Sequence, residues 1–134
     1  MLEFSCHMIS PGKAEGEALC SKDPILFYHT DFSTGVFREP GHALEGICIA
    51  QKVLIFPGGK GSSAVQADGM YKLDMAKLAP AGLIVSCLDT VLVSSAIIME
   101  VPMVDDVDPR FYDEIRSGDR IRLEATNGKI YILR

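Results

Sequence analysis

An uninterrupted apolar run followed by a glycine loop is the feature that most constrains how this chain folds. Residues 52–56 (KVLIF) have the composition of a buried strand, residues 57–61 (PGGKG) predict a tight loop, and residues 62–78 are long enough for a helix. A second strand is predicted at residues 81–87 (AGLIVSC), followed by a largely apolar helix at residues 90–101. Because parallel strands covered on both faces lose the alternation of apolar and polar residues, we predict a βαβα unit.

The segments on either side of this unit predict short strands and turns. The first fifty residues are rich in β-branched and aromatic residues, glycine and proline, and they show no helical period. We expect strands there at residues 3–9, 15–20 and 25–28.

The C-terminal third completes a mixed fold. It predicts a short strand at residues 102–104, a helical turn at 109–116, and a hairpin in which Asn127-Gly128 joins residues 120–125 to residues 129–133. The predicted fold class is therefore α/β, with a β-rich N-terminal half wrapped on a βαβα core. This layout is typical of swivelling β/β/α domains, and we expect residues 1–134 to form a single domain.

The acidic net charge excludes some classes of partner. Thirteen Lys and Arg against eighteen Asp and Glu give a net charge of -5, which repels nucleic acid and anionic membrane surfaces. No run of 18 uncharged apolar residues could span a bilayer, and the acidic start of the chain lacks the basic segment of a secretory signal. We expect a soluble cytoplasmic protein that binds neither nucleic acid nor membrane.

The cysteines do not form a metal-binding motif. No CxxC pair is present, and the four thiols are far apart in the sequence, at Cys6, Cys20, Cys48 and Cys87. We expect buried apolar fillers rather than ligands, and no metal site in this chain. The acidic cluster of Asp105, Asp106 and Asp108 is typical of a solvated loop.

The candidate chemistry lies at residues 57–64 (PGGKGSSA). Glycine takes positive φ angles at little cost, so this loop can turn sharply and approach a ligand closely. Ser62 falls at the N-cap or first turn of the next helix, where unpaired N–H groups and the helix dipole attract anions. The same environment stabilises negative charge on a hydroxyl, as a serine acting as a base requires, and Lys60 adds a cation.

Other interpretations of this loop remain open. Ser62 can serve only as an N-cap; if it projects into a cleft instead, Ser63 takes the capping position. Residues 59–64 also fit the dinucleotide-binding pattern G-x-G-x-x-A, with Asp89 ending the next strand. The corresponding fold, however, needs more parallel strands and has no place for the β-rich first fifty residues. The Walker A pattern does not fit.

A few side chains outside the loop are weaker candidates. Acid–base chemistry is conceivable for two histidines and two carboxylates, His29, His42, Asp31 and Glu45. The methionines of the predicted helices are expected to pack in the core, namely Met70, Met75 and Met99.

A series of motifs, taken in order, resembles the small-subunit swivelling domain of the aconitase X family. The motifs are PGKAEGEAL at residues 11–19, DPILF at 23–27, TG at 34–35, GHALEG at 41–46, KVLIFPGGKGSSA at 52–64 and LAPAGLIV at 78–85. The resemblance covers about residues 9–104. The ordered set is far more specific than any single motif in it.

The resemblance implies a catalytic role for Ser62. In the wider aconitase superfamily, a serine in a G-S-S element of the swivelling domain is the catalytic base, opposite an iron–sulfur cluster carried by the rest of the enzyme. Ser62 matches that serine and Ser63 its neighbour, and substrate binding is expected from Lys60, Gly61 and Ser63. The family commonly has arginine at the position of Lys60. The bidentate contact of a guanidinium with a carboxylate or phosphate is therefore replaced here by the point-charge contact of an ammonium. Ala64 replaces a polar residue, and the arginine that follows the paired serines in true aconitases is absent, which argues against citrate as the substrate.

The implied activity is a hydro-lyase reaction that needs a large aconitase X subunit, as a heterodimer with the iron–sulfur cluster on that partner. Two-subunit members dehydrate (R)-5-phosphomevalonate to trans-anhydromevalonate 5-phosphate in the archaeal mevalonate pathway of isoprenoid synthesis. Related members dehydrate cis-3-hydroxy-L-proline. A separate small subunit and a phosphate-compatible loop favour the former. From the residues alone, a non-catalytic phosphate- or dinucleotide-binding module stays open, whereas a phosphohistidine carrier would need a histidine where Ser62 stands.

Overall fold

An eight-stranded mixed sheet organises the protein in the computed structural model, which describes residues 1–134. The strands are β1 (Leu2–Ser5), β2 (His7–Ser10), β3 (Lys13–Cys20), β4 (Val53–Phe56), β5 (Gly82–Val85), β6 (Met103–Asp105), β7 (Arg120–Glu124) and β8 (Lys129–Ile132). Their order across the sheet is β1-β8-β7-β3-β4-β5-β6-β2. Strands β3 to β6 run parallel, and the outer pairs are antiparallel. The predicted α/β class is confirmed.

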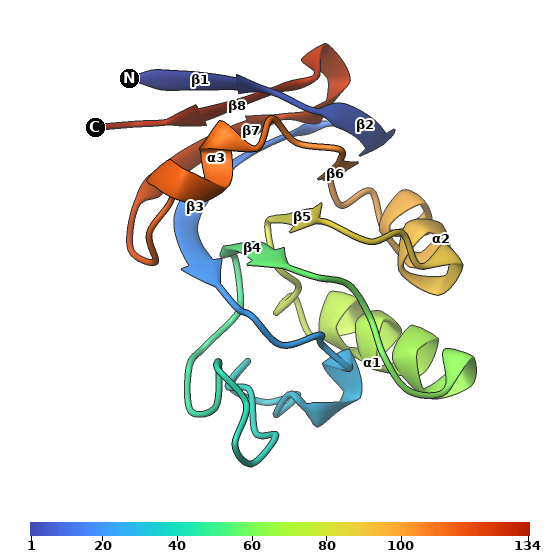
Figure 1. Ribbon diagram of the computed structural model, residues 1–134. Helices are drawn as coiled ribbons and strands as arrows, with labels where there is room; N and C mark the ends of the chain where they lie inside the picture. Colours follow the sequence, from blue (N-terminus) through green and yellow to red (C-terminus); the bar gives the residue numbers. More distant parts are fainter.

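The two outer strands of this sheet are consecutive in the sequence. Only Cys6 separates β1, which pairs with β8, from β2, which pairs with β6 at the opposite side. The sheet therefore curls until its sides approach each other (Figure 1). The prediction of one strand at residues 3–9 is wrong because the chain crosses between the two sides at Cys6, whose N–H donates to the Gly128 carbonyl.

The predicted βαβα unit is confirmed as β4, α1 (Ser63–Met75), β5 and α2 (Thr90–Ile98). Every side chain of β4 and β5 is buried, and neighbours along each strand point to opposite faces. Leu54 and Phe56 pack toward the helices, whereas Val53 and Ile55 pack inside the curl. This burial on both faces explains the unbroken apolar run. Strands β3 and β6 extend the parallel region beyond the two strands of the predicted unit.

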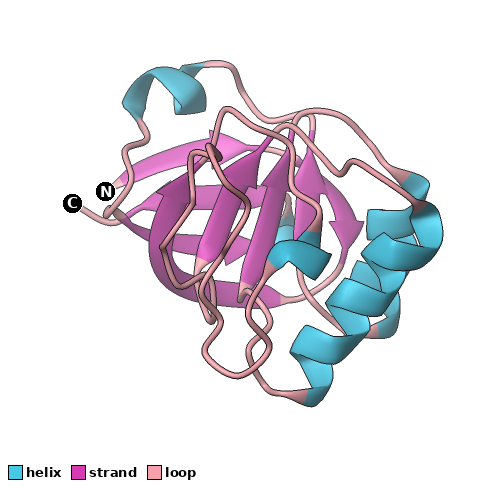
Figure 2. Ribbon diagram, turned by 90° about the horizontal axis from the view of Figure 1, so that it is seen from below, coloured by secondary structure: helices cyan, strands magenta, loops and turns pink.

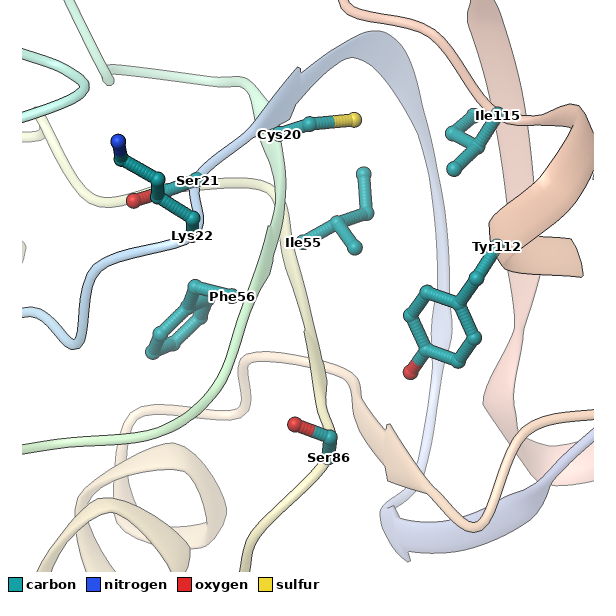
Figure 3. Close-up of a pocket in the computed structure, with 8 residues that line it drawn as sticks. All are labelled: Cys20, Ser21, Lys22, Ile55, Phe56, Ser86, Tyr112 and Ile115. Carbon is teal, nitrogen blue, oxygen red and sulfur yellow. The ribbon is translucent and has the colours of Figure 1, made fainter. Parts of the chain in front are cut away.

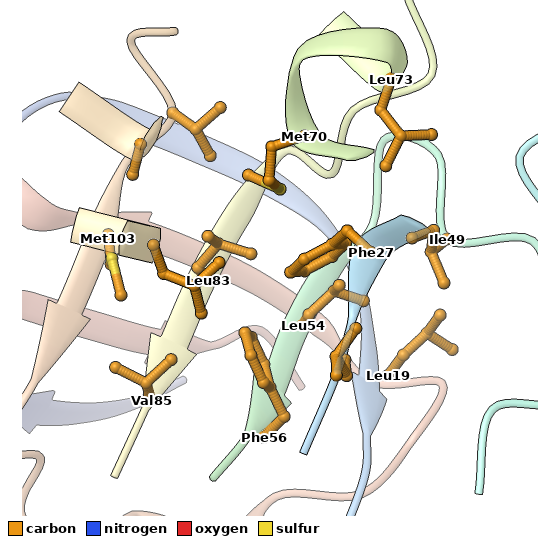
Figure 4. Packing of buried hydrophobic residues seen from close by; sticks show 14 of the residues in the cluster. Leu19, Phe27, Ile49, Leu54, Phe56, Met70, Leu73, Leu83, Val85 and Met103 are labelled. Atoms are coloured by element: carbon orange, nitrogen blue, oxygen red, sulfur yellow. The ribbon is translucent and has the colours of Figure 1, made fainter. Parts of the chain in front are cut away.

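The hydrophobic core accordingly has two parts. One lies between the sheet, the helices and the irregular segment at residues 21–52, and Figure 4 shows Phe27, Ile49, Met70 and Leu73 meeting the strands there. The other fills the curl under α3 (Arg110–Glu114) and includes Phe111. Helices α1 and α2 lie side by side against the sheet (Figure 2). None of the helices combines the length and the apolar character needed to cross a bilayer.

Both long helices end earlier than predicted. Helix α1 stops at Met75 and α2 at Ile98, because Lys77 and Glu100 take left-handed backbone angles with φ of 61° and 58°. Met70 is buried as predicted, and Met99 is partly buried at the end of α2. The prediction for Met75 is wrong: it lies on the outer side of the last turn of α1, and its side chain is exposed.

Residues 21–52 contain less regular structure than predicted. In place of a strand at residues 25–28, an isolated bridge at Ile25 precedes a short 3-10 helix, η1 (Phe27–His29). The side-chain amide of Gln66 explains this, because its Oε1 accepts from the Phe27 N–H at 2.8 Å and its Nε2 donates to the Ile25 carbonyl at 2.8 Å. A helix side chain thus satisfies the backbone groups that a neighbouring strand would otherwise pair.

The C-terminal hairpin is confirmed. Strands β7 and β8 pair antiparallel from Ile121–Ile132 to Glu124–Lys129. A 3-10 turn, η2 (Ala125–Asn127), joins them, followed by Gly128 with a left-handed φ of 67°. The predicted helical turn before the hairpin corresponds to α3.

Candidate functional site

The candidate site lies at the carboxyl ends of β4 and β5. In open parallel sheets, ligands bind where the loops that follow the strands lead into helices. Here the loops after Phe56 and Val85 lead to the N-termini of α1 and α2. The Cys87 N–H donates to the Pro57 carbonyl at 2.8 Å, which ties the two loops together.

Two glycines of the loop are required by its geometry. A Cβ on Gly59 would collide with the carboxylate of Asp89 and the side-chain amide of Gln66. Gly61 has a left-handed φ of 82°, so the residue before Ser62 must adopt an angle that other residues avoid. The loop therefore passes close to the cap of α2 and then turns sharply into α1.

Ser62 occupies the N-cap of α1, as predicted, but its side chain makes no capping hydrogen bond. Its carbonyl accepts the first helical bond from the Gln66 N–H at 2.9 Å. The N–H groups of residues 63–65 thus have no partner in the helix. Ser62 and Ser63 are both exposed. The arrangement combines a free hydroxyl with the positive end of a helix dipole.

Asp89 shows the contrast at the second helix. Its Oδ1 accepts from the Val91 N–H at 2.9 Å and from the Leu92 N–H at 3.4 Å, so α2 is capped by its own side chain. Asp89 therefore has a capping role that needs no ligand. In the dinucleotide interpretation, an acidic residue at the end of the second strand would instead bind a ribose hydroxyl, so the capping contacts disfavour that interpretation.

The ammonium group of Lys60 forms an ion pair with a carboxylate from another segment. Its Nζ lies 2.7 Å from Oε2 of Glu39, in a pair whose side chains are 37% and 19% exposed. Glu39 was not predicted as a site residue, because nothing in the sequence links it to a lysine twenty-one positions away. The only available signal was a carboxylate next to the Pro40-Gly41 turn.

The two histidines have different surroundings. His42 is buried, its Nδ1 accepts from the Leu44 N–H at 3.0 Å, and its Nε2 donates to the Pro24 carbonyl at 2.9 Å. Both ring nitrogens are therefore occupied by backbone groups, and the ring is structural. His29 is half exposed, and its Nε2 lies 3.8 Å from Oε1 of Glu39.

Asp31 and Glu45 are turn residues. Hydrogen bonds from the Ser33 hydroxyl and N–H hold the pKa of Asp31 below its usual range. Glu45 accepts from the Gly41 N–H at 3.0 Å. Neither carboxylate forms a hydrogen bond or an ion pair with the glycine loop.

Two hollows lie beside the strand ends. The first, of about 300 Å³, opens at the ends of β3, β4 and β5, with Ile55 and Ile115 as apolar lining and the Ser86 and Tyr112 hydroxyls at its border (Figure 3). Burial raises the pKa of Tyr112. The second, of about 420 Å³, lies between the start of α1, where Ser63 and Ala64 line it, and the length of α2 from Thr90 to Ile98. Neither hollow was predicted from the sequence.

Comparison with known proteins shows the family to which the chain belongs. Residues 3–132 match the family described as the aconitase X swivel domain. The chain belongs to this family. The fold is therefore that of an aconitase X swivel domain, as the sequence resemblance implied.

Known relatives and a solved structure of aconitase X are similar to this chain over nearly its whole length. The phosphomevalonate dehydratase small subunit of Methanococcoides burtonii is 36% identical over 133 residues, covering 98% of this chain and 96% of the relative. The protein of that name from Methanosarcina mazei is 39% identical over 134 residues, covering 99% and 92%. The crystal structure of holo-form aconitase X from Thermococcus kodakaraensis superposes with a TM-score of 0.90 at 35% identity, covering 100% of both chains.

The cysteines of this swivel domain differ in exposure. Cys6, Cys20 and Cys48 are partly buried, whereas Cys87 is exposed in the loop after β5, so its prediction as a buried filler is wrong. Burial raises the pKa of Cys6 to about 11 and also raises the pKa of Cys20. No three His, Cys, Asp or Glu side chains lie close enough together to hold a metal ion.

This difference predicts selective alkylation. At pH 7.5, iodoacetamide should modify Cys87 at least about tenfold faster than Cys6, because only the thiolate reacts and Cys6 is almost fully protonated. Labelling of Cys6 should rise as the pH approaches its pKa of about 11. Peptide mass spectrometry over time measures both rates; equal rates at pH 7.5 would contradict the burial of Cys6.

Proposed function

We propose that this chain is the single swivelling domain that forms the small subunit of a cytoplasmic hydro-lyase. The enzyme dehydrates (R)-5-phosphomevalonate to trans-anhydromevalonate 5-phosphate, with Ser62 as the proton acceptor. The observation that carries the proposal is the free Ser62 hydroxyl at the uncapped N-terminus of α1. The names of the relatives, all phosphomevalonate dehydratase small subunits, support the substrate.

Ser62 fits the role of a base because its surroundings stabilise negative charge. Once deprotonated, its oxygen lies next to the unpaired N–H groups of the first turn of α1 and the positive end of the dipole. It then takes the proton from the carbon next to the substrate carboxylate, and the C–H electron pair becomes the new C=C bond as the C–O bond of the neighbouring carbon breaks. The departing hydroxide becomes water by taking up the proton that Ser62 first released. The Oγ can approach a substrate because no backbone group occupies it.

Binding of the substrate anion is assigned to Lys60, Gly61 and Ser63. The loop and the first turn of α1 present backbone N–H groups, which hold phosphate or carboxylate oxygens well. Lys60 donates one ammonium proton to Glu39 and has two more for an anion. The hollow that includes Ser63 lies directly beside this group.

The iron–sulfur cluster of the family does not fit on this chain. No cluster of ligand side chains exists, and the partly buried thiols lie apart, with Cys6 between β1 and β2 and Cys20 at the end of β3. We therefore assign the cluster to a large subunit, which the small-subunit names of the relatives imply. Exposed apolar side chains near the site, including Leu88 and Ile98, support contact with such a partner.

The test is anaerobic turnover of (R)-5-phosphomevalonate by this chain co-expressed with its large subunit, with each subunit alone as control. Activity of the pair alone is the expected result. Dehydration of cis-3-hydroxy-L-proline instead would keep the reaction and change the substrate. Inertness toward both, with binding of a dinucleotide or inorganic phosphate by the isolated chain, would overturn the proposal in favour of a binding module.

A further inference from the structure

The ammonium group of Lys60 is held by a residue that lies outside the glycine loop. Its ammonium pairs with Glu39, which belongs to the irregular segment before β4, and with no other carboxylate. At 2.7 Å and with both side chains partly shielded from solvent, this is a charge-assisted hydrogen bond in a partly buried setting. Such a bond restricts a side chain that would otherwise sample many rotamers.

Glu39 is itself held in place by the backbone around it. The Arg38 N–H donates to the His29 carbonyl at 2.9 Å, and the His42 N–H donates to the Glu39 carbonyl at 3.3 Å. His42 anchors this turn further through its buried ring, which bonds the backbone on both sides. The GHALEG motif therefore supports the backbone on which Glu39 stands.

Only one carboxylate oxygen of Glu39, Oε2, has a hydrogen-bond partner, and that partner is Lys60. Glu39 Oε1 is buried and has no hydrogen-bond donor within reach, since His29 Nε2 remains 3.8 Å away. The charge of Glu39 is therefore compensated chiefly by the lysine. The two side chains form one unit, in which neither has an equivalent alternative partner.

We propose that Glu39 is a positioning residue, which acts on the substrate only through Lys60. It holds the ammonium beside the loop that bears Ser62 and leaves two of its protons for the substrate anion. This inference rests on the proposed function of the loop. It adds a residue from a different segment to the anion site and gives the GHALEG turn a role in binding.

The test is a double-mutant cycle in the assembled enzyme, using Glu39→Ala, Lys60→Ala and the double variant. Glu39→Ala should raise KM about tenfold and leave kcat within about threefold, because a mobile lysine weakens binding rather than the chemical step. The double variant should have the KM of Lys60→Ala alone, since Glu39 has no effect without its lysine. Multiplied effects, or a fall in kcat alone, would overturn the proposal.

Two further variants separate positioning from folding. Glu39→Gln keeps an acceptor for the ammonium and should recover most of the KM, whereas a merely structural loss would not follow this order. Lys60→Arg keeps a cation that can pair with Glu39 and should raise KM less than Lys60→Ala, although a guanidinium donates in a different geometry. Thermal unfolding of each variant checks that the fold is intact.

The pairing of Glu39 with Lys60 can also be tested without turnover, in case the enzyme is inactive on the chosen substrates. In the full chain with isotope-labelled lysine, the ammonium resonance of Lys60 should be visible and protected from exchange. Glu39→Ala should abolish that protection. An unchanged resonance would overturn the positioning role, whereas an inert wild-type complex with normal protection would reject only the proposed function.

Discussion

Replacing Ser62 with alanine should lower turnover of the assembled enzyme by about 10³-fold, the usual contribution of a general base. The same change should alter the free energy of unfolding of this chain by less than about 0.5 kcal/mol, although loss of a typical serine N-cap costs about 1 kcal/mol. The reason is that the Ser62 hydroxyl makes no capping hydrogen bond. Steady-state kinetics and urea unfolding measure the two quantities.

Two neighbouring positions provide matched controls. Ser63→Ala removes an exposed hydroxyl one residue further on and should reduce turnover far less than Ser62→Ala. Asp89→Ala removes the two capping bonds of α2 and should destabilise the chain by about 1 kcal/mol. If Ser62→Ala destabilised the chain as much as Asp89→Ala and kept turnover within tenfold, Ser62 would be a structural cap only.

Replacing Gln66 with leucine should destabilise the chain by about 3 kcal/mol. The substitution leaves the Phe27 N–H and the Ile25 carbonyl buried without partners, and each unpaired group costs about 1–3 kcal/mol. Ile25 in turn donates to the Gly58 carbonyl at 3.0 Å, so the glycine loop should loosen as well. Urea denaturation gives the change in stability, and a loss below about 1 kcal/mol would contradict the importance of this amide.

Gln66→Glu is the sharper control for the same site. A protonated carboxyl group can accept from Phe27 and donate to Ile25, as the amide does, whereas a carboxylate cannot donate. Burial and the nearby Asp89 favour the protonated form in the folded state. The variant should therefore be close to wild type at pH 4 and lose stability as the pH rises toward 7.

The sequence predicted the βαβα unit well because its signals are local. A few consecutive residues are enough to predict each of its parts, namely the buried strands β4 and β5 and the glycine loop between β4 and α1. The position of Ser62 follows from the same local order. The irregular segment before β4 was predicted poorly because its backbone is satisfied by a distant helix side chain, Gln66, rather than by a strand.

The parts of the structure that were not predicted depend on contacts between segments that are distant in the sequence. Glu39 reaches Lys60 only because a turn anchored by His42 brings it there, and no periodicity encodes that approach. The split of the first strand at Cys6 likewise depends on partners in the last third of the chain. Met75 was misassigned because α1 ends one turn earlier than its composition suggested, which leaves that side chain on the outer surface.

The consecutive outer strands have a consequence for how the chain is made. β2 pairs with β6 and β1 pairs with β8, so each strand pairs with a segment far away in the sequence. Neither strand can pair until its distant partner has been made. Closure of the sheet therefore depends on contacts with large sequence separation, which form slowly. Until it closes, β1 and β2 are open to pairing with a foreign strand.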